Sequence, residues 1–201
     1  METPNLKNLP AVKIEKSKLP TLAELFDDSL ALAGKQEGLN ALLNAEPPKT
    51  WVKEHPFIKG HRYVPIDKVE YLLRKIFKHY QIEITGQGTA FNGVWVTVRV
   101  HYFNPSINTM SFVDGIGAIQ LQTKKDTSPT DLINLNNGAI SMAFPIAKSL
   151  AIKDACQLLG NIFGGNLDRK DTIQFEPDQE IITKSREEQR KEKLKANGVN
   201  V

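Results

Sequence analysis

The sequence predicts an α+β fold: an antiparallel β-meander of three to four strands, with a helix before it and a long, kinked helix after it that packs across the sheet. Two changes in the spacing of apolar residues indicate this order. The spacing is helical over 65–80, alternates over 81–85 and 91–103, and becomes helical again after residue 131. With 201 residues, 40% of them apolar, the chain is long enough to bury one sizeable core.

Charge divides the chain into three expected regions. An N-terminal flank, 1–46, carries 5 Lys and Arg against 7 Asp and Glu. The core domain, 47–175, carries 15 against 10, and the C-terminal tail, 176–201, carries 6 against 6. The excess of positive charge therefore lies in the core domain, which weakly favours a polyanionic partner.

The two flanks are predicted from short patterns. An apolar stripe at helical spacing covers 20–32, and 38–45 is expected to be a second short helix. The stripe consists of Leu22, Leu25, Phe26 and Leu30. We hypothesise that these helices pack on a neighbouring copy of the chain. The tail 176–201 is dense in mixed charge, so it is expected to be a solvated helix or disordered.

The core domain begins with an extended connector, 46–57, which contains three prolines, and an amphipathic helix over 65–80. The apolar face of that helix consists of Ile66, Val69, Leu72, Leu73 and Ile76. In the strand 91–103, residues 94, 96, 98, 100 and 102 point to one face, and Trp95, Thr97, Arg99 and His101 point to the other. A turn over 104–109 precedes further strand material at 110–115 and 116–123.

A polar loop, 124–131, separates the meander from the last helix of the core domain. Pro145 is expected to kink or restart that helix, and Gly164 with Gly165 is expected to end it as a left-handed cap. Alanine recurs at every fourth position, at 139, 143, 147, 151 and 155. Small residues at this spacing allow the helix to approach a sheet or a neighbouring subunit closely.

No pattern typical of an enzyme is present, so we expect binding rather than catalysis, and neither cofactor nor metal. The glycines of 86–88 and 115–117 lack the lysine of a phosphate loop and are better explained as turns or bulges in the sheet. The four histidines and the single Cys156 have no zinc-ligand spacing. Four aspartates in turns and caps form no cluster at a suggestive spacing: Asp114, Asp126, Asp131 and Asp168.

Hydropathy and cysteine content together predict a cytoplasmic protein. There is no run of about 18 apolar residues that could span a membrane, and the first residues lack the apolar segment of a secretory signal. One cysteine excludes an intramolecular disulfide framework, which agrees with a reducing compartment.

Basic residues of the sheet and its loop are candidates for contacts with nucleic acid. Arg99 shares a sheet face with Trp95, and this face either stacks bases and pairs with phosphates or simply tolerates an exposed arginine. Lys124 and Lys125 lie at the tip of the loop 124–131, where they are either surface charges or contacts to a strand backbone.

Basic residues near the two core helices are the other candidates. Arg62 precedes the first core helix, where the helix dipole disfavours cations. Lys153 either faces a ligand or pairs with its neighbour Asp154, and Lys148 lies about 140° around the helix from it. Arg169 and Lys170 follow the apolar segment of the last helix, and a core helix alone does not explain them.

Four stretches of the core domain resemble the single-strand annealing proteins of the Rad-fifty-two superfamily, especially the phage members related to the Red beta and Erf recombination proteins. They are GHR at 60–62, VWVTVRVHY at 94–102, VDGIGA at 113–118 and AIKDACQLLGNIFGGNLDRKD at 151–171. The resemblance covers about 57–172, and its last stretch is the most specific. It implies a helix, a β-meander and a long helix packed across the sheet.

The resemblance implies ATP-independent binding and annealing of complementary single DNA strands in recombination and repair. It implies a homo-oligomeric ring or filament that holds single-stranded DNA and the annealed duplex intermediate. A phage exonuclease and a host single-strand binding protein are the implied partners, in the bacterial cytoplasm if a phage encodes the chain.

Site residues follow from the same resemblance. Arg62 matches an arginine that contacts the strand backbone in an inner groove, and Lys153 matches the first lysine of a basic cluster in that groove. The following arginines of the cluster are Asp154 and Gln157 here, so the groove is less basic, and Lys148 is expected to compensate. Residues 164–170, with Arg169 and Lys170, are expected to turn the chain back along a subunit interface. Lys124 and Lys125 resemble the hairpin lysines of an outer DNA site.

Two other classes of function stay open. A single-stranded nucleic-acid coating protein on a similar scaffold would bind strands without accelerating their pairing. A purely structural oligomer would use the basic residues as interface salt bridges, and its DNA binding would be weak or insensitive to salt.

Overall fold

A computed structural model of the chain describes residues 30–55, 58–128, 130–172 and 176–198. Its fold is α+β, which confirms the predicted class. The helices are α2 (Leu30–Leu43), α3 (Ile66–Ile76), α4 (Ala139–Gln157) and α5 (Gln179–Ala196). The strands are β1 (Lys53–Glu54), β2 (Arg62–Tyr63), β3 (Tyr80–Ala90), β4 (Gly93–Asn104) and β5 (Thr109–Gln120). Short 3-10 helices lie at Lys49–Trp51, Leu132–Asn134 and Asn161–Phe163.

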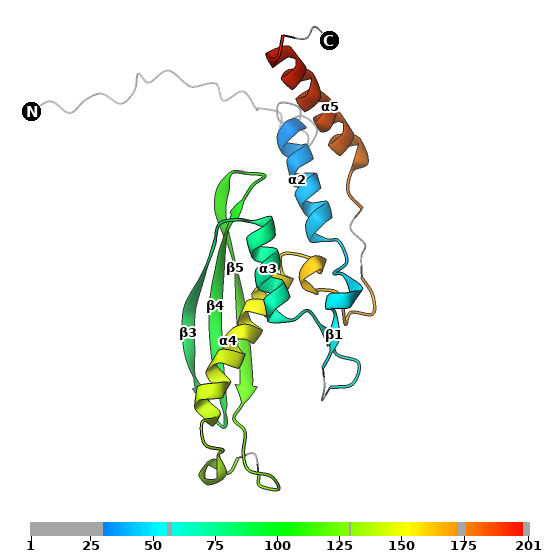
Figure 1. The fold of residues 1–201 in the computed structure, drawn as a ribbon. Helices are drawn as coiled ribbons and strands as arrows, with labels where there is room; N and C mark the ends of the chain where they lie inside the picture. Colours follow the sequence, from blue (N-terminus) through cyan, green and yellow to red (C-terminus); the bar gives the residue numbers. More distant parts are fainter. Residues whose placement is uncertain (1–29, 56–57, 129, 173–175, 199–201) are drawn as a thin grey trace, which may run out of the picture.

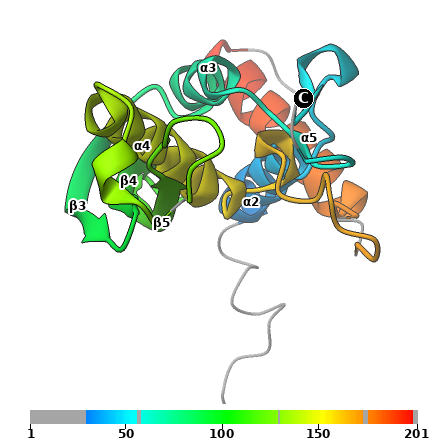
Figure 2. The ribbon, with the colours of Figure 1, turned by 90° about the horizontal axis from the view of Figure 1, so that it is seen from below.

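The meander is a three-stranded antiparallel sheet in the order β3-β4-β5. Residues 110–115 and 116–123, predicted as separate strand material, largely form the single strand β5. The alternation in β4 is confirmed, because the valines at 94, 96, 98 and 100 are buried. Helices α3 and α4 lie on that side of the sheet, and no described helix lies on the other side (Figures 1 and 2). The sheet therefore has one covered face and one open face.

Helix α4 lies unusually close to β5. The five alanines spaced four residues apart are all buried, as expected for a face that contacts the sheet. Opposite them, a methyl group added at Gly117 would overlap the backbone oxygen of Ala147, and one added at Gly115 would overlap the backbone of Ala151 and Ala155. The prediction that the glycines at 115 and 117 form a turn or bulge is wrong, because β5 pairs with β4 through them without a register shift. They are glycine because the helix backbone passes directly over them.

The glycines at 86 and 88 are explained differently. The register of β3 against β4 shifts between Ile84 and Gly86, so the predicted bulge is confirmed. On the open face, the Trp95 ring lies across both glycines, and a Cβ at Gly88 would come within 2.9 Å of it.

The predicted restart of the last helix at Pro145 is wrong, since α4 runs unbroken from Ala139 to Gln157. Pro145 and Ser141 are both exposed, so the Ser141 carbonyl that loses its helical partner can be solvated. The predicted helix end is also displaced. Gly164 is left-handed, with φ of 93°, but it ends the short 3-10 helix at Asn161–Phe163 rather than α4.

Both flanks contribute to one helical pair. The predicted helix at 38–45 is the second half of α2, and the part of the apolar stripe at 20–29 lies outside the described residues. The tail forms α5, whose Ile182 and Ser185 are buried, and Ser185 packs against Gly34 of α2. Figure 1 shows the two helices side by side. The tail is therefore not merely a solvated appendage.

Substituting Gly117 with alanine tests the close approach of α4 to β5. The added methyl group meets helix backbone that cannot move alone, so we expect a loss of about 3 kcal/mol in the free energy of unfolding. Gly38→Ala is the matched control, because Gly38 lies within α2 with nothing near the added methyl, and it should gain roughly 0.5–1 kcal/mol. Chemical denaturation measures both, and equal effects would contradict the account.

Substituting Phe91 with asparagine tests the turn between β3 and β4. Phe91 is fully exposed and has φ of 52°, a conformation that asparagine and glycine adopt more easily. We expect Phe91→Asn to raise the free energy of unfolding by about 1 kcal/mol. Phe112→Asn replaces an exposed phenylalanine within a strand, so it should bring no gain. A lower stability for Phe91→Asn would refute this explanation of the turn.

Candidate functional site

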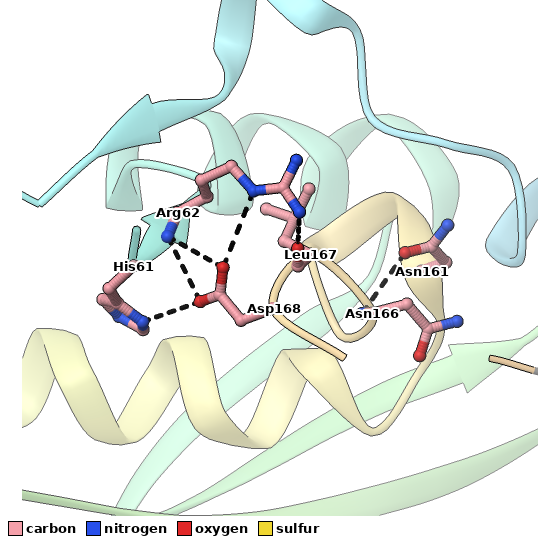
Figure 3. Close-up of polar contacts among 6 residues, drawn as sticks. All are labelled: His61, Arg62, Asn161, Asn166, Leu167 and Asp168. Carbon is pink, nitrogen blue, oxygen red and sulfur yellow. Dashed lines mark hydrogen bonds and ion pairs between the residues drawn. The ribbon is translucent and has the colours of Figure 1, made fainter. Parts of the chain in front are cut away.

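Two segments far apart in the chain meet at Asp168. The backbone N–H of Arg62 donates to both carboxylate oxygens of Asp168, at 2.9 and 3.2 Å. Nδ1 of His61 lies 2.6 Å from the same carboxylate, and Nε of Arg62 lies 3.7 Å from it. The Arg62 guanidinium also donates to the carbonyl of Leu167 (Figure 3). A single carboxylate therefore fixes the start of β2 to the segment that follows α4.

Local structure holds each side of this junction. On one side, β1 pairs with β2, and the His55 N–H donates to the His61 carbonyl at 2.7 Å. On the other side, Gly160 lies so close to Leu43 of α2 that only glycine fits. The side chain of Asn161 then accepts a hydrogen bond from the Asn166 N–H at 3.3 Å. The chain is thus folded back so that Asp168 reaches β2.

A polar cleft of about 680 Å³ opens beside the junction. Its charged lining residues are Lys49, Lys53, Arg62, Glu46 and Glu54. The amides of Asn44, Asn161 and Asn166 contribute donors and acceptors. Cations and amides of this kind can contact a phosphate backbone, while the two carboxylates reduce the net positive charge of the cleft.

Lys153 lies on the other side of β2 from this cleft. It does not pair with Asp154, whose carboxylate instead accepts the Ile116 N–H at 3.0 Å. Its ammonium lies 4.8 Å from the centre of the Tyr63 ring, a cation–π contact. The side chain is half-buried, and this burial lowers the pKa of the Lys153 ammonium. Because adjacent strand residues point to opposite sides, Arg62 faces the cleft and Tyr63 faces Lys153.

Arg99 lies on the open sheet face, and its charge is already neutralised. Its guanidinium makes two hydrogen bonds to Asp114, at 2.7 and 2.8 Å, and stacks 4.2 Å from the Phe112 ring centre. The hydrogen bonds raise the pKa of Arg99 and lower that of Asp114. Beside them, His101 contacts Glu83 at 3.0 Å. A phosphate on this face would meet two carboxylates, so we do not include Arg99 in the candidate site.

The other predicted basic residues do not all lie near β2. Lys124 and Lys125 are exposed in a loop that Figure 1 shows beyond the lower end of the sheet, whereas β1 and β2 lie beside the opposite end of α4. Arg169 and Lys170 are exposed directly after Asp168, and Lys148 is exposed on α4. The structure therefore gathers Arg62, Arg169 and Lys170, with Lys153 behind β2, and leaves Lys124 and Lys125 apart.

Sequence reasoning missed two of the site's side chains. Asp168 was predicted only as a common turn or cap aspartate, and Tyr63 was not singled out. No sequence pattern near either residue indicates its role, because the residues that they contact lie elsewhere in the chain. Among the described residues, no group of three or more His, Cys, Asp or Glu could hold a metal ion. No helix in the described ranges is long and apolar enough to cross a membrane.

Neither a scan against protein-family models nor a search of curated proteins finds a relative of this chain.

Substituting Asp168 with asparagine tests whether this carboxylate fixes the junction. The change removes the charge that faces His61 and Arg62 and replaces one acceptor with a donor. We expect the free energy of unfolding to fall by about 1–2 kcal/mol. Asp171→Asn removes an equally charged, exposed residue of the same segment, so it should have no effect in the same denaturation experiment. Identical curves for the two variants would show that Asp168 anchors nothing.

Proposed function

We propose that the protein binds single-stranded DNA and anneals complementary strands without ATP, as a homo-oligomeric ring or filament. The observation that carries the proposal is the contact between residues 61–62 and 167–168. These positions belong to the first and last stretches of the family resemblance, and they are bonded to each other beside the exposed Arg169 and Lys170. On this proposal the three-stranded sheet with α3 and α4 is an annealing core.

Annealing requires electrostatics and geometry rather than bond chemistry. Arg62, Arg169, Lys170 and Lys153 would neutralise phosphates of a strand that runs around β2, with Lys148 farther along α4. Each neutralised phosphate releases counterions and so favours binding. Because backbone contacts carry no sequence information, any strand could be held while its bases test a complement. The protein would then act in recombination and repair, in the cytoplasm, with a phage exonuclease and a host single-strand binding protein as partners.

A strand-coating protein without annealing activity is the second candidate. Asp154 occupies a position where the resembled family has an arginine. Its carboxylate accepts the Ile116 N–H and so joins α4 to β5. Gln157 replaces a second arginine. The lower positive charge would still permit binding, while two negatively charged strands would be brought together less effectively.

The test is the annealing rate of two labelled complementary oligonucleotides, without ATP. We expect strong acceleration by the wild type and a slowing of about tenfold or more in Lys153→Glu, since the variant places negative charge against the phosphates. Lys191→Glu, an exposed substitution on α5, should anneal like the wild type. Circular dichroism verifies the fold of each variant.

Three results would change the conclusion. Strand binding without acceleration would favour the coating protein. Absence of strand binding at moderate salt would overturn both candidates. Equal slowing by the two charge reversals would mean that net charge matters and that the position of Lys153 does not.

A further inference from the structure

An apolar groove of about 360 Å³ lies between β2 and α4. Its apolar lining consists of Tyr63, Pro65, Ile66, Pro145, Ile146 and Leu150. The two prolines have no backbone N–H, so neither offers a donor to a ligand. The remaining lining residues are Ser149 and Lys153, and the Ser149 hydroxyl already donates to the Pro145 carbonyl at 2.9 Å. The groove thus offers a ligand apolar walls, one phenol and one ammonium.

The Lys153 ammonium has no carboxylate partner among the described residues. The neighbouring Asp154 carboxylate accepts the Ile116 backbone N–H, and the Lys153 ammonium contacts the Tyr63 ring. A half-buried cation against an aromatic face has lost part of its hydration and gained only a modest attraction in return. An anion that entered the groove would supply the missing countercharge.

The ligand that fits must combine an anion with a flat apolar surface. One nucleotide of a single strand has both, because its base can stack on an aromatic ring while its phosphate pairs with a cation. The bases of a duplex are already stacked and paired, so they would not enter the groove. A sugar-phosphate chain without bases would contact Lys153 but leave the apolar walls of the groove exposed to water.

We propose that one nucleobase of a bound single strand lies in this groove against the Tyr63 ring, with its phosphate on Lys153. The inference rests on the proposed function and adds to it a base contact, made by a residue that no phosphate contact requires. Binding of a base moves the ammonium from the ring towards the phosphate. The remaining bases of the strand stay outside the groove, available to a complement.

Equilibrium binding of the full chain to two labelled strands of equal length tests the proposal. One strand is oligothymidylate, and the other has the same phosphates with abasic sugars. We expect the wild type to bind oligothymidylate on the order of tenfold more tightly. Tyr63→Leu should reduce the ratio of the two affinities towards one, while Tyr63→Phe, which keeps the ring, should retain the wild-type ratio. Thermal unfolding controls for the fold of each variant.

Lys153→Met separates the two contacts. The Lys153→Met variant should still bind oligothymidylate more tightly than the abasic strand. The plot of log affinity against log salt should become shallower by about 0.7, the value for one phosphate of a single strand. A wild type that anneals strands but binds the abasic strand equally well overturns the base contact alone. The same holds if the folded Tyr63→Leu variant retains the full preference. A wild type that binds neither strand overturns the proposed function itself.

Discussion

The close approach of α4 to β5 determines where every element of the candidate site lies. Two glycines on the strand and a line of alanines on the helix remove the side chains that would keep the backbones apart. Helix α4 can therefore lie flat on the sheet, with its C-terminal end beside α2, where Gly160 contacts Leu43. From that position the chain needs only a short 3-10 helix to fold back, and Asp168 arrives at β2. A wider helix–sheet spacing would separate the two sides of the junction.

The basic residues on the open sheet face and those around β2 differ in their partners. On the open sheet face, Arg99 forms an ion pair with Asp114, and His101 contacts Glu83. Around β2, the Arg62 guanidinium lies at the longer distance of 3.7 Å from Asp168, Arg169 and Lys170 are exposed, and Lys153 has only an aromatic ring as its partner. The function proposed for this protein depends on that second group.

Periodic features could be predicted from the sequence because they are local. The alternation of valines in β4 and the spacing of alanines in α4 each follow from a few neighbouring residues, and both are confirmed. The role of a glycine pair is harder to predict. The stretches GQG at 86–88 and GIG at 115–117 look alike, but Gly86 lies at a bulge and Gly117 packs against a helix. The junction at Asp168 could not be derived from spacing, because its partner lies 106 residues away. The family resemblance indicated both stretches without indicating that they touch.

Hydrogen–deuterium exchange of the full chain, with and without a saturating single strand, tests the location of the site most directly. We expect slower exchange in β2, in the part of α4 that lines the groove around Lys153, and in residues 166–170. Unchanged exchange is expected in the loop 124–131 and in the strands β3 and β4, whose Glu83, Arg99 and His101 lie on the open face. Protection confined to that loop or to the open face would contradict the account, because strand binding would then occur where the charges are distant from β2 or already neutralised.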